Sequence, residues 1–337
     1  MTRLTYLSTR VKLRRAVGGF AVLALLSIVL APLAGSTHIN LLRVFDRSIP
    51  FPDNLDAQIF VVARLPRVLA AALVGATLAA AGVVFQALLR NPLADPFTLG
   101  ISAGASAGAM LAIVLGATTT GAPPVALASL AGAALGAGIV YRLATLRRAP
   151  LSTSVLLLAG VTLNAFFAAA VMGLQYVADF TQIARAARWL MGDLDVGGFA
   201  PLAATLVLVV PAAVLFATLP SALNVLSLGD DAAAARGVDV PRAQRLAFLG
   251  AALATAGAVS LAGPVGFVGI IVPHLVRLLV GGDHRIVLPS AALLGASFLV
   301  VCDLVARTAL TPVELPVGIV TAIIGGPFFL WLLVQRG

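Results

Sequence analysis

The stretch Val68–Leu89, VLAAALVGATLAAAGVVFQALL, decides the class of fold, because none of its 22 residues carries a charge. A helix that crosses the ~30 Å hydrocarbon core of a bilayer needs about 20 such residues. The whole chain has the same character, since 61% of its 337 residues are hydrophobic and only 10% are charged. Its mean hydropathy is +1.07, which excludes an ordinary soluble domain. We therefore expect an all-α membrane protein with several transmembrane helices.

Ten apolar stretches are long enough to be transmembrane helices, with ends that sequence patterns place only to within a few residues. With their loops they use nearly the whole chain, so we predict a single transmembrane domain over residues 1–337. The predicted spans are 17–34, 66–89, 97–115, 124–146, 153–176, 199–219, 245–262, 265–280, 286–305 and 316–334. The eighth span is short and contains Pro273, so we expect it to be broken or tilted.

Basic residues indicate the orientation, because cytoplasmic loops are enriched in Lys and Arg. If the N-terminus is cytoplasmic, fifteen of the 22 basic residues but only five of the 13 acids lie on the inner side. The inner basic residues are Arg3, Arg10, Lys12, Arg14, Arg15, Arg90, Arg142, Arg147, Arg148, Arg236, Arg242, Arg245, Arg277, Arg285 and Arg336. We predict that both termini are cytoplasmic. The net charge of +9 then reflects topology and attraction to membrane lipid, not binding to nucleic acid.

Residues 1–36 also fit a cleaved signal peptide, with a basic start, an apolar run and the small residues Ala34-Gly35-Ser36. The apolar run is longer than the usual core of such a signal. We therefore expect this segment to remain in the protein as its first span.

Ionisable side chains are missing from the middle of every predicted span. Such groups mark proton relays and ion-coupled pumps, so their absence disfavours an ion-driven secondary transporter, although backbone carbonyls can still hold sodium. A P-loop for ATP hydrolysis needs a lysine after its glycines, and Lys12 is the one lysine in the chain. No paired carboxylates or cluster of His and Cys indicates a catalytic or metal site. We predict no enzyme activity, metal site or cofactor in this chain.

The longest charged inner connection is residues 220–245, which contain the segment 226–238, LSLGDDAAAARGV. Gly229 is suited to ending one helical turn, the two aspartates after it favour the start of a helix, and Gly237 favours the end of that helix. We predict a short amphipathic helix on the cytoplasmic surface that docks another protein. A solvated connector is the alternative.

Three other segments have local explanations when each is taken alone. Asn91–Pro96, NPLADP, predicts a stiff turn, and Ser152 or Thr153 is suited to capping the fifth span. On the outer side, Arg64-Leu-Pro-Arg67 stands at the mouth of the second span and Arg307 at the end of the ninth. Exposed arginines there are suited to anchoring at the membrane surface, or to pairing with carboxylates on a docking protein.

Several motifs, taken in order along residues 55–337, resemble one family. They are Arg64–Arg67 (RLPR), Gln86–Ala103 (QALLRNPLADPFTLGISA), Leu156–Gly160 (LLLAG), Trp189–Gly192 (WLMG), Gly263–Gly269 (GPVGFVG), Val272–Arg277 (VPHLVR), Asp283–Arg285 (DHR) and Glu314–Gly318 (ELPVG). This order resembles the FecCD family, the permease subunits of bacterial ABC importers for ferric siderophores, vitamin B12 and haem.

The resemblance implies a type II ABC importer permease with ten transmembrane helices in the inner (cytoplasmic) membrane of a bacterium. It implies a homodimer with two separate ATP-binding subunits, which use ATP and Mg²⁺, and a periplasmic binding protein that delivers a metal chelate. Substrate is expected to pass between the fifth spans of the two copies. Ala94–Gly100, ADPFTLG, resembles siderophore and vitamin B12 permeases slightly more than haem permeases. An ion-coupled secondary transporter is the alternative.

The resemblance also assigns roles to matching positions. Coupling to the ATPase maps to Leu228, Gly229, Asp230, Asp231, Ala234, Arg236 and Gly237. The cytoplasmic gate maps to Asn91, Leu93, Ser152 and Thr153, and docking of the binding protein maps to Arg64, Arg67 and Arg307. The periplasmic gate lies near Asp179, where relatives commonly carry a smaller hydroxylated residue, and Arg185 and Arg188 add charge to the same mouth.

Overall fold

The computed structural model describes residues 2–116, 123–146 and 151–336, and a helix lies in each of the ten predicted spans. These helices are α1 (Thr2–Leu30), α4 (Leu65–Leu88), α5 (Ile101–Val114), α6 (Pro123–Thr145), α7 (Thr153–Val177), α9 (Ala200–Thr218), α12 (Val240–Ala262), α13 (Val268–Val280), α14 (His284–Thr308) and α15 (Val317–Arg336). Shorter helices are α2 (Leu41–Val44), α3 (Leu55–Gln58), α8 (Phe180–Leu190), α10 (Pro220–Leu226) and α11 (Asp230–Ala234). Arg147 and Arg148, predicted to be inner basic residues, lie outside the described residues.

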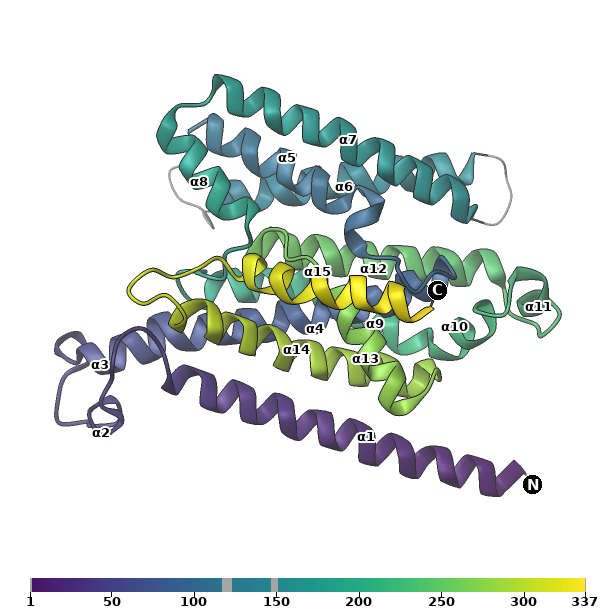
Figure 1. Cartoon of the computed structure of the whole chain (residues 1–337), viewed down its shortest axis with the longest axis horizontal. Helices are drawn as coiled ribbons and strands as arrows, with labels where there is room; N and C mark the ends of the chain where they lie inside the picture. Colours follow the sequence, from purple (N-terminus) through teal and green to yellow (C-terminus); the bar gives the residue numbers. More distant parts are fainter. Residues whose placement is uncertain (1, 117–122, 147–150, 337) are drawn as a thin grey trace.

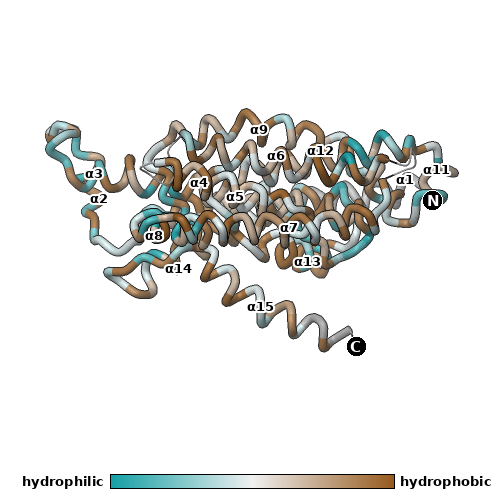
Figure 2. Tube along the Cα trace, turned by 90° about the horizontal axis from the view of Figure 1, so that it is seen from above, coloured by the Kyte–Doolittle hydropathy of each residue, from teal (hydrophilic) through white to brown (hydrophobic). Residues whose placement is uncertain are grey.

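Seven helices of the described part of the chain are long and apolar enough to cross a membrane, and α5, α13 and α15 are shorter apolar helices. The bundle is hydrophobic along its middle and hydrophilic toward its two ends (Figure 2). A bilayer requires an apolar surface where the protein meets the hydrocarbon core and polar surfaces where it meets water. Helices meet the further requirement that backbone polar groups be paired within the protein. The chain is therefore a multi-pass membrane protein.

The centre of the bundle is formed by α4 and α12. The most apolar stretch that includes α4 is 83% buried inside the protein and that of α12 is 78% buried, whereas that of α9 is 17% buried. The outer helices pack around this pair, with α14 and α13 against α4, and α9 and α6 against α12. In Figure 1, α5, α6 and α7 form a layer on one side, while α14 and α1 lie on the other.

Glycines bring the helix backbones close together at the main crossings. A Cβ atom on Gly75 would lie 2.1 Å from the carbonyl oxygen of Gly295 on α14, and one on Gly104 would lie 2.3 Å from that of Gly132 on α6. Gly82 lies against Gly269 at the start of α13 in the same way. Small residues permit this approach in a membrane, where association depends on van der Waals contact. These glycines therefore serve as packing residues at the helix crossings.

The break expected at Pro273 lies elsewhere. Helix α13 runs without interruption through Pro273, whereas the preceding residues 263–267 belong to no helix and Phe267 has a φ of +69°. The interruption therefore separates α12 from α13. Pro273 is tolerated because it is the sixth residue of α13. It lies close to the first turn of the helix, where backbone N–H groups have no intrahelical acceptors.

The loops gather at two opposite ends of the bundle (Figure 1). Helices α2, α3 and α8 lie at one end, and α10 and α11 lie at the other. The N-terminus lies at the α11 end, and α15 runs toward that end as well. This arrangement creates one candidate site on each surface of the membrane.

Candidate functional site

The segment 226–238 forms the short surface helix that the sequence predicts. Gly229 has a φ of +115°, which side chains other than glycine rarely adopt, and it separates α10 from α11. At the other end, Gly237 has a φ of +78°, its N–H donates to the carbonyl of Ala234, and the N–H of Val238 donates to that of Ala233. These two bonds form a Schellman C-cap, so α11 is a defined helix of five residues.

The predicted coupling residues fall into two groups. The exposed group projects from the surface of α10 and α11 and consists of Leu228, Asp231, Ala234, Arg236 and Gly237. Leu228 is 63% exposed although it is apolar. Asp230 and Gly229 are partly buried and face the bundle. The first group is suited to contact with a partner, and the second to contact with this chain's own helices.

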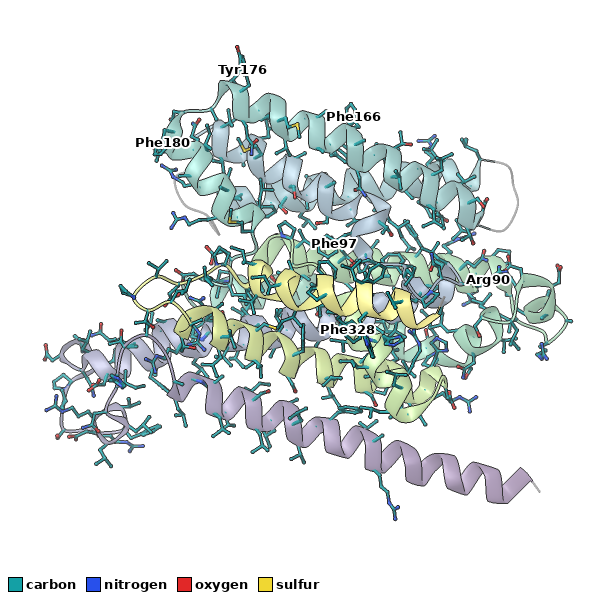
Figure 3. The ribbon with its side chains drawn as sticks, viewed as in Figure 1. Arg90, Phe97, Phe166, Tyr176, Phe180 and Phe328 are labelled. Atoms are coloured by element: carbon teal, nitrogen blue, oxygen red, sulfur yellow. The ribbon has the colours of Figure 1, made fainter. Side chains whose placement is uncertain are left out.

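Asp230 joins α11 to the turn that follows α4. Its Oδ1 lies 2.5 Å from a terminal guanidinium nitrogen of Arg90, which Figure 3 places beside this end of the bundle. Arg90 itself has a φ of +49° and directly precedes Asn91. The side-chain oxygen of Asn91 accepts the N–H of Leu93 at 2.9 Å, so the turn predicted from NPLADP is confirmed.

Gln244 on α12 extends this network to the start of α7. Its side chain is 2% exposed, its Nε2 donates to Oδ1 of Asp230 at 3.2 Å, and its Oε1 accepts the backbone N–H of Leu151 at 2.8 Å. Leu151 directly precedes Ser152, whose hydroxyl oxygen accepts the N–H of Val155 and caps α7. Asp230 is thus linked to both segments that hold the predicted cytoplasmic gate residues, Asn91 with Leu93 and Ser152 with Thr153.

Asp95 lies at the end of the same turn and is buried. Its Oδ1 accepts the N–H of Phe97 at 3.1 Å and caps the 3₁₀ helix Pro96–Leu99. Burial raises the pKa of Asp95 to about 7, against the opposing effect of the Phe97 N–H. Burial therefore keeps this carboxyl group protonated to a higher pH than an exposed aspartate.

Three arginines form an outer cluster at the other end of the bundle. Nε of Arg67 lies 2.9 Å from Oδ1 of Asp303, and Nε of Arg307 lies 3.0 Å from Oδ2 of the same carboxylate. Arg67 also pairs with Glu314 at 2.5 Å. Arg64 donates to the carbonyl oxygens of Pro32 and Thr37.

The expectation that these arginines are exposed at the rim is wrong. Arg64 is 6% exposed and Arg307 is 3% exposed. The physical reason is that Asp303 and the carbonyl groups after α1 offer partners inside the protein, which offset the cost of removing the guanidinium groups from water. The cluster still borders a depression of about 240 Å³ at this end of the bundle, lined by Arg64, Arg67 and Arg307.

Asp179 is the N-cap of α8. Its carboxylate accepts the N–H of Gln182 at 2.8 Å, and the side chain of Gln182 accepts the N–H of Asp179 at 3.0 Å, which completes a capping box. Asp, Ser and Thr are all good N-caps, so an acid in place of a hydroxylated residue preserves this local structure. Tyr176 and Phe180, on either side of Asp179, point away from the bundle (Figure 3) and are 92% and 87% exposed.

The model of the FecCD transport family matches residues 23–335. The chain belongs to this family. It is 40% identical to the hemin transport system permease protein of Yersinia pestis over 323 residues, with 94% of this chain and 96% of the relative covered. It is 38% identical to the vitamin B12 import system permease protein of Escherichia coli over 318 residues, with 94% of each chain covered.

A solved structure gives the same result for the three-dimensional fold. A metal-chelate type ABC transporter in an inward-facing conformation superposes with a TM-score of 0.81 at 33% identity, and covers 95% of this chain and 99% of its own. Membership of the FecCD family, with this fold, makes the chain a permease component of an ABC transporter and not its catalytic component. In the described residues, no group of three or more His, Cys, Asp or Glu side chains is placed to hold a metal ion.

Sequence reasoning missed three residues that organise the two ends of this FecCD permease. Asp303 is an isolated acid within an apolar stretch, and that isolation was the available signal, whereas Gln244 stands between Arg242 and Arg245 and gave no such signal. Glu314 was noted only as part of a family motif. The sequence does not show that Gln244 meets Asp230, 14 positions away, or that Asp303 and Glu314 meet Arg67, 236 and 247 positions away.

Proposed function

We propose that this chain is the translocation subunit of an ATP-driven importer that carries a metal chelate, such as a ferric siderophore, cobalamin or haem, across a bacterial inner membrane. The observation that carries the proposal is the set of contacts made by Asp230, because one carboxylate on a surface helix reaches both predicted gate segments. The imported class follows from the relatives named for hemin and vitamin B12 transport.

Ten helices cross the membrane in this proposal, with both termini in the cytoplasm. The short helices α5 and α13 then span with help from the irregular residues next to them. Support comes from the positions of the N-terminus and α11 at the same end (Figure 1). Support also comes from the excess of basic residues predicted for that side.

Two copies of the chain face each other through α7. Leu158, Phe166, Met172 and Tyr176 are exposed and recur at helical spacing along this helix. An apolar stripe of this kind, continued by Phe180 at the start of α8, is suited to a self-complementary interface around a twofold axis. The chelate moves along that axis, and its specificity comes from the binding protein that delivers it.

ATP and Mg²⁺ bind to two separate ATPase subunits under the dimer. Those subunits contact the exposed coupling residues Leu228, Asp231, Ala234, Arg236 and Gly237. Closure of the ATPases moves α11, and Asp230 transfers the movement to Asn91 and Leu93 through Arg90, and to Ser152 and Thr153 through Gln244. Discrete hydrogen-bonded links between rigid elements are suited to this kind of transfer.

The periplasmic binding protein docks over the outer cluster. Arg64, Arg67 and Arg307 line a concave surface there, and arginine pairs well with carboxylates on a partner. Asp303 and Glu314 already form ion pairs with Arg67, and Asp303 also pairs with Arg307. Carboxylates of the docking protein therefore either replace these acids or form additional ion pairs with the same arginines. The nearby periplasmic gate includes Asp179 with α8.

Reconstitution into liposomes tests the proposal. The chain alone should accumulate no labelled cobalamin, ferric siderophore or haem under a proton or sodium gradient. Addition of the ATPase subunits, the binding protein and ATP should give uptake of the cognate chelate. Uptake by the lone chain under an ion gradient would instead establish a secondary transporter and overturn the proposal.

A further inference from the structure

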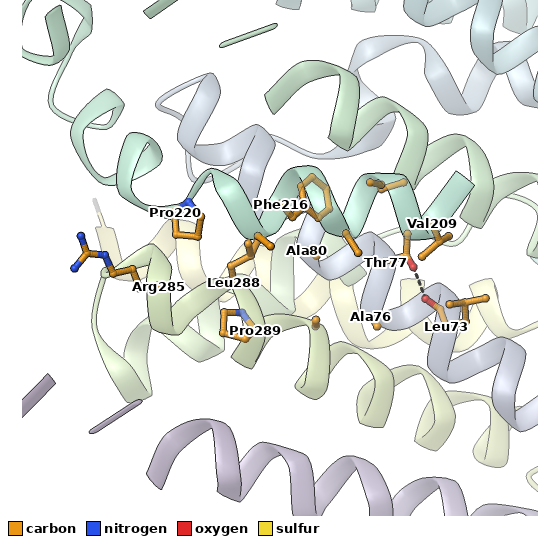
Figure 4. A pocket seen from close by; sticks show the side chains of 15 residues that line it. Leu73, Ala76, Thr77, Ala80, Val209, Phe216, Pro220, Arg285, Leu288 and Pro289 are labelled. Carbon is orange, nitrogen blue, oxygen red and sulfur yellow. Dashed lines mark hydrogen bonds between the residues drawn. The ribbon is translucent and has the colours of Figure 1, made fainter. Parts of the chain in front are cut away.

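A pocket of about 440 Å³ lies between α4, α9 and α14 (Figure 4). Small side chains create the space, among them Ala76 on α4, Ala213 on α9 and Ala292 on α14. Phe216 and Leu288 form larger parts of its wall. The volume is within the range of pockets that bind small ligands, about 300–1,000 Å³.

The wall of the pocket is suited to an apolar occupant. The hydroxyl of Thr77 is already used, since it donates to the carbonyl of Leu73 at 2.6 Å (Figure 4). The remaining lining residues apart from Arg285 are Ala, Leu, Val, Phe and Pro. A hydrocarbon chain therefore fits this wall without leaving a buried polar group unpaired.

The depth of the pocket is smaller than the thickness of one leaflet. Its lining runs from Arg285 to Ala292 on α14 and from Val209 to Ala217 on α9, which corresponds to about 10–12 Å at 1.5 Å per helical residue. The hydrocarbon core of a bilayer is ~30 Å thick. The pocket thus occupies less than half of the membrane, in the half next to α10 and α11.

Arg285 closes the end of the pocket that faces the α11 side. It is exposed, its guanidinium donates to the hydroxyl of Ser221 at 3.3 Å, and it belongs to none of the ion pairs found among the described residues. Basic pockets between transmembrane helices bind anionic headgroups, and the cytoplasmic leaflet is the anionic one. The guanidinium group of Arg285 and the apolar cavity therefore match the anionic headgroup and the acyl chain of a single lipid molecule.

We propose that this pocket binds one anionic phospholipid, with the phosphate at Arg285 and an acyl chain between α4, α9 and α14. The site is separate from the proposed substrate route, because none of its lining residues lies on α7. It also does not depend on which solute is carried.

Native mass spectrometry of the full chain tests the site. The protein is released from nanodiscs that contain equal amounts of phosphatidylglycerol and phosphatidylcholine with the same acyl chains. The unmodified chain should retain phosphatidylglycerol about fivefold more than phosphatidylcholine, the ratio expected from one arginine near the membrane surface. Arg285→Gln should abolish that preference, whereas Arg242→Gln, at an exposed arginine that does not line the pocket, should keep it.

Filling the pocket tests the position of the acyl chain. Ala213→Trp should reduce retention of both lipids, and Val214→Trp, on the neighbouring exposed position outside the pocket, should not. Ala217→Phe is a second filling variant in case the first fails to fold, and thermal unfolding checks all variants. Equal retention of both lipids by the unmodified chain, an unchanged preference in Arg285→Gln, or full retention in a folded filling variant would each overturn the proposal. A filling variant that lost binding to a partner protein but kept the lipid would also overturn the proposal.

Discussion

The backbone N–H of Leu151 donates to the side chain of Gln244 at 2.8 Å. The two residues are 93 positions apart, and both are buried. This bond attaches the residue before the N-cap of α7 to α12. Through the second contact of Gln244, with Asp230, it also connects that residue to the surface helix α11. It gives the proposed coupling segment a physical connection to the helix that lines the proposed substrate route.

Replacement of Gln244 should uncouple ATP hydrolysis from transport. Gln244→Met leaves the buried N–H of Leu151 without its acceptor, which costs about 1–3 kcal/mol of stability. Gln244→Glu keeps that acceptor but places a second carboxylate beside Asp230. We expect both variants to lower chelate uptake per ATP hydrolysed in the reconstituted complex. Both should also lower the unfolding temperature, because Gln244→Met leaves a buried N–H unpaired and Gln244→Glu buries a carboxylate beside Asp230. Normal uptake per ATP in both variants would exclude Gln244 from the route.

The ion pair between Arg90 and Asp230 should matter more for transport than for stability. Both side chains are about one-third exposed, and such pairs contribute about 0–1 kcal/mol. Arg90→Gln should therefore leave the unfolding temperature nearly unchanged but reduce ATP-driven uptake several-fold, as measured with radiolabelled chelate. Arg242→Gln, at an exposed arginine on the neighbouring helix, serves as the control. Equal uptake by the two variants would contradict the coupling role of Arg90.

Asp303 should be among the most costly residues to replace at the outer side. Its side chain has no exposed surface and it pairs with both Arg67 and Arg307, so Asp303→Asn leaves the buried Arg307 without its ion pair and leaves Arg67 with Glu314 alone. We expect a loss of about 3–5 kcal/mol, seen as a large drop in the unfolding temperature in detergent. Glu314→Gln, at a partner that is 41% exposed, should cost about 0–1 kcal/mol. Similar effects of the two substitutions would mean that the cluster is solvated.

The pKa of Asp95 predicts a pH-dependent stability. Because burial raises the pKa from 3.8 to about 7, the folded protein binds this proton more tightly than the unfolded chain. The stabilisation is complete below pH 3.8 and is lost as the pH rises through 7, by at most about 1.4 kcal/mol per pH unit. Asp95→Asn keeps the acceptor for the Phe97 N–H, so its stability should fall less between pH 5 and 8.

Thermal unfolding as a function of pH measures this difference. Asp231→Asn, at an exposed aspartate on α11, should retain the pH profile of the unmodified protein. Parallel profiles for Asp95→Asn and the unmodified protein would show that Asp95 stays ionised throughout this range.

The cap at Asp179 allows a structural role to be separated from a gating role. Asp179→Ser should preserve α8, because a hydroxyl also caps a helix, whereas Asp179→Ala should cost about 0.5–2 kcal/mol. Hydrogen exchange at the N–H of Gln182 reports the state of the cap. If uptake falls as much in Asp179→Ser as in Asp179→Ala while the cap remains protected, the carboxylate itself acts in the periplasmic gate.

The sequence by itself determined the membrane class, the approximate positions of the long apolar helices and the ends of α11. These features depend on hydropathy over about 20 residues and on the conformations of single residues such as Gly229 and Gly237, and both are local properties. The same is true of the turn at Asn91 and of the cap at Ser152.

Only the tertiary structure decided which polar groups meet. The links from Asp230 to Arg90 and from Leu151 to Gln244, the burial of Arg64 and Arg307, and the pocket that ends at Arg285 all depend on how separate helices pack. Hydropathy places each helix in the bilayer but does not select its neighbours. That selection comes from close contacts such as Gly75 against Gly295, which become evident only when both helices are in place.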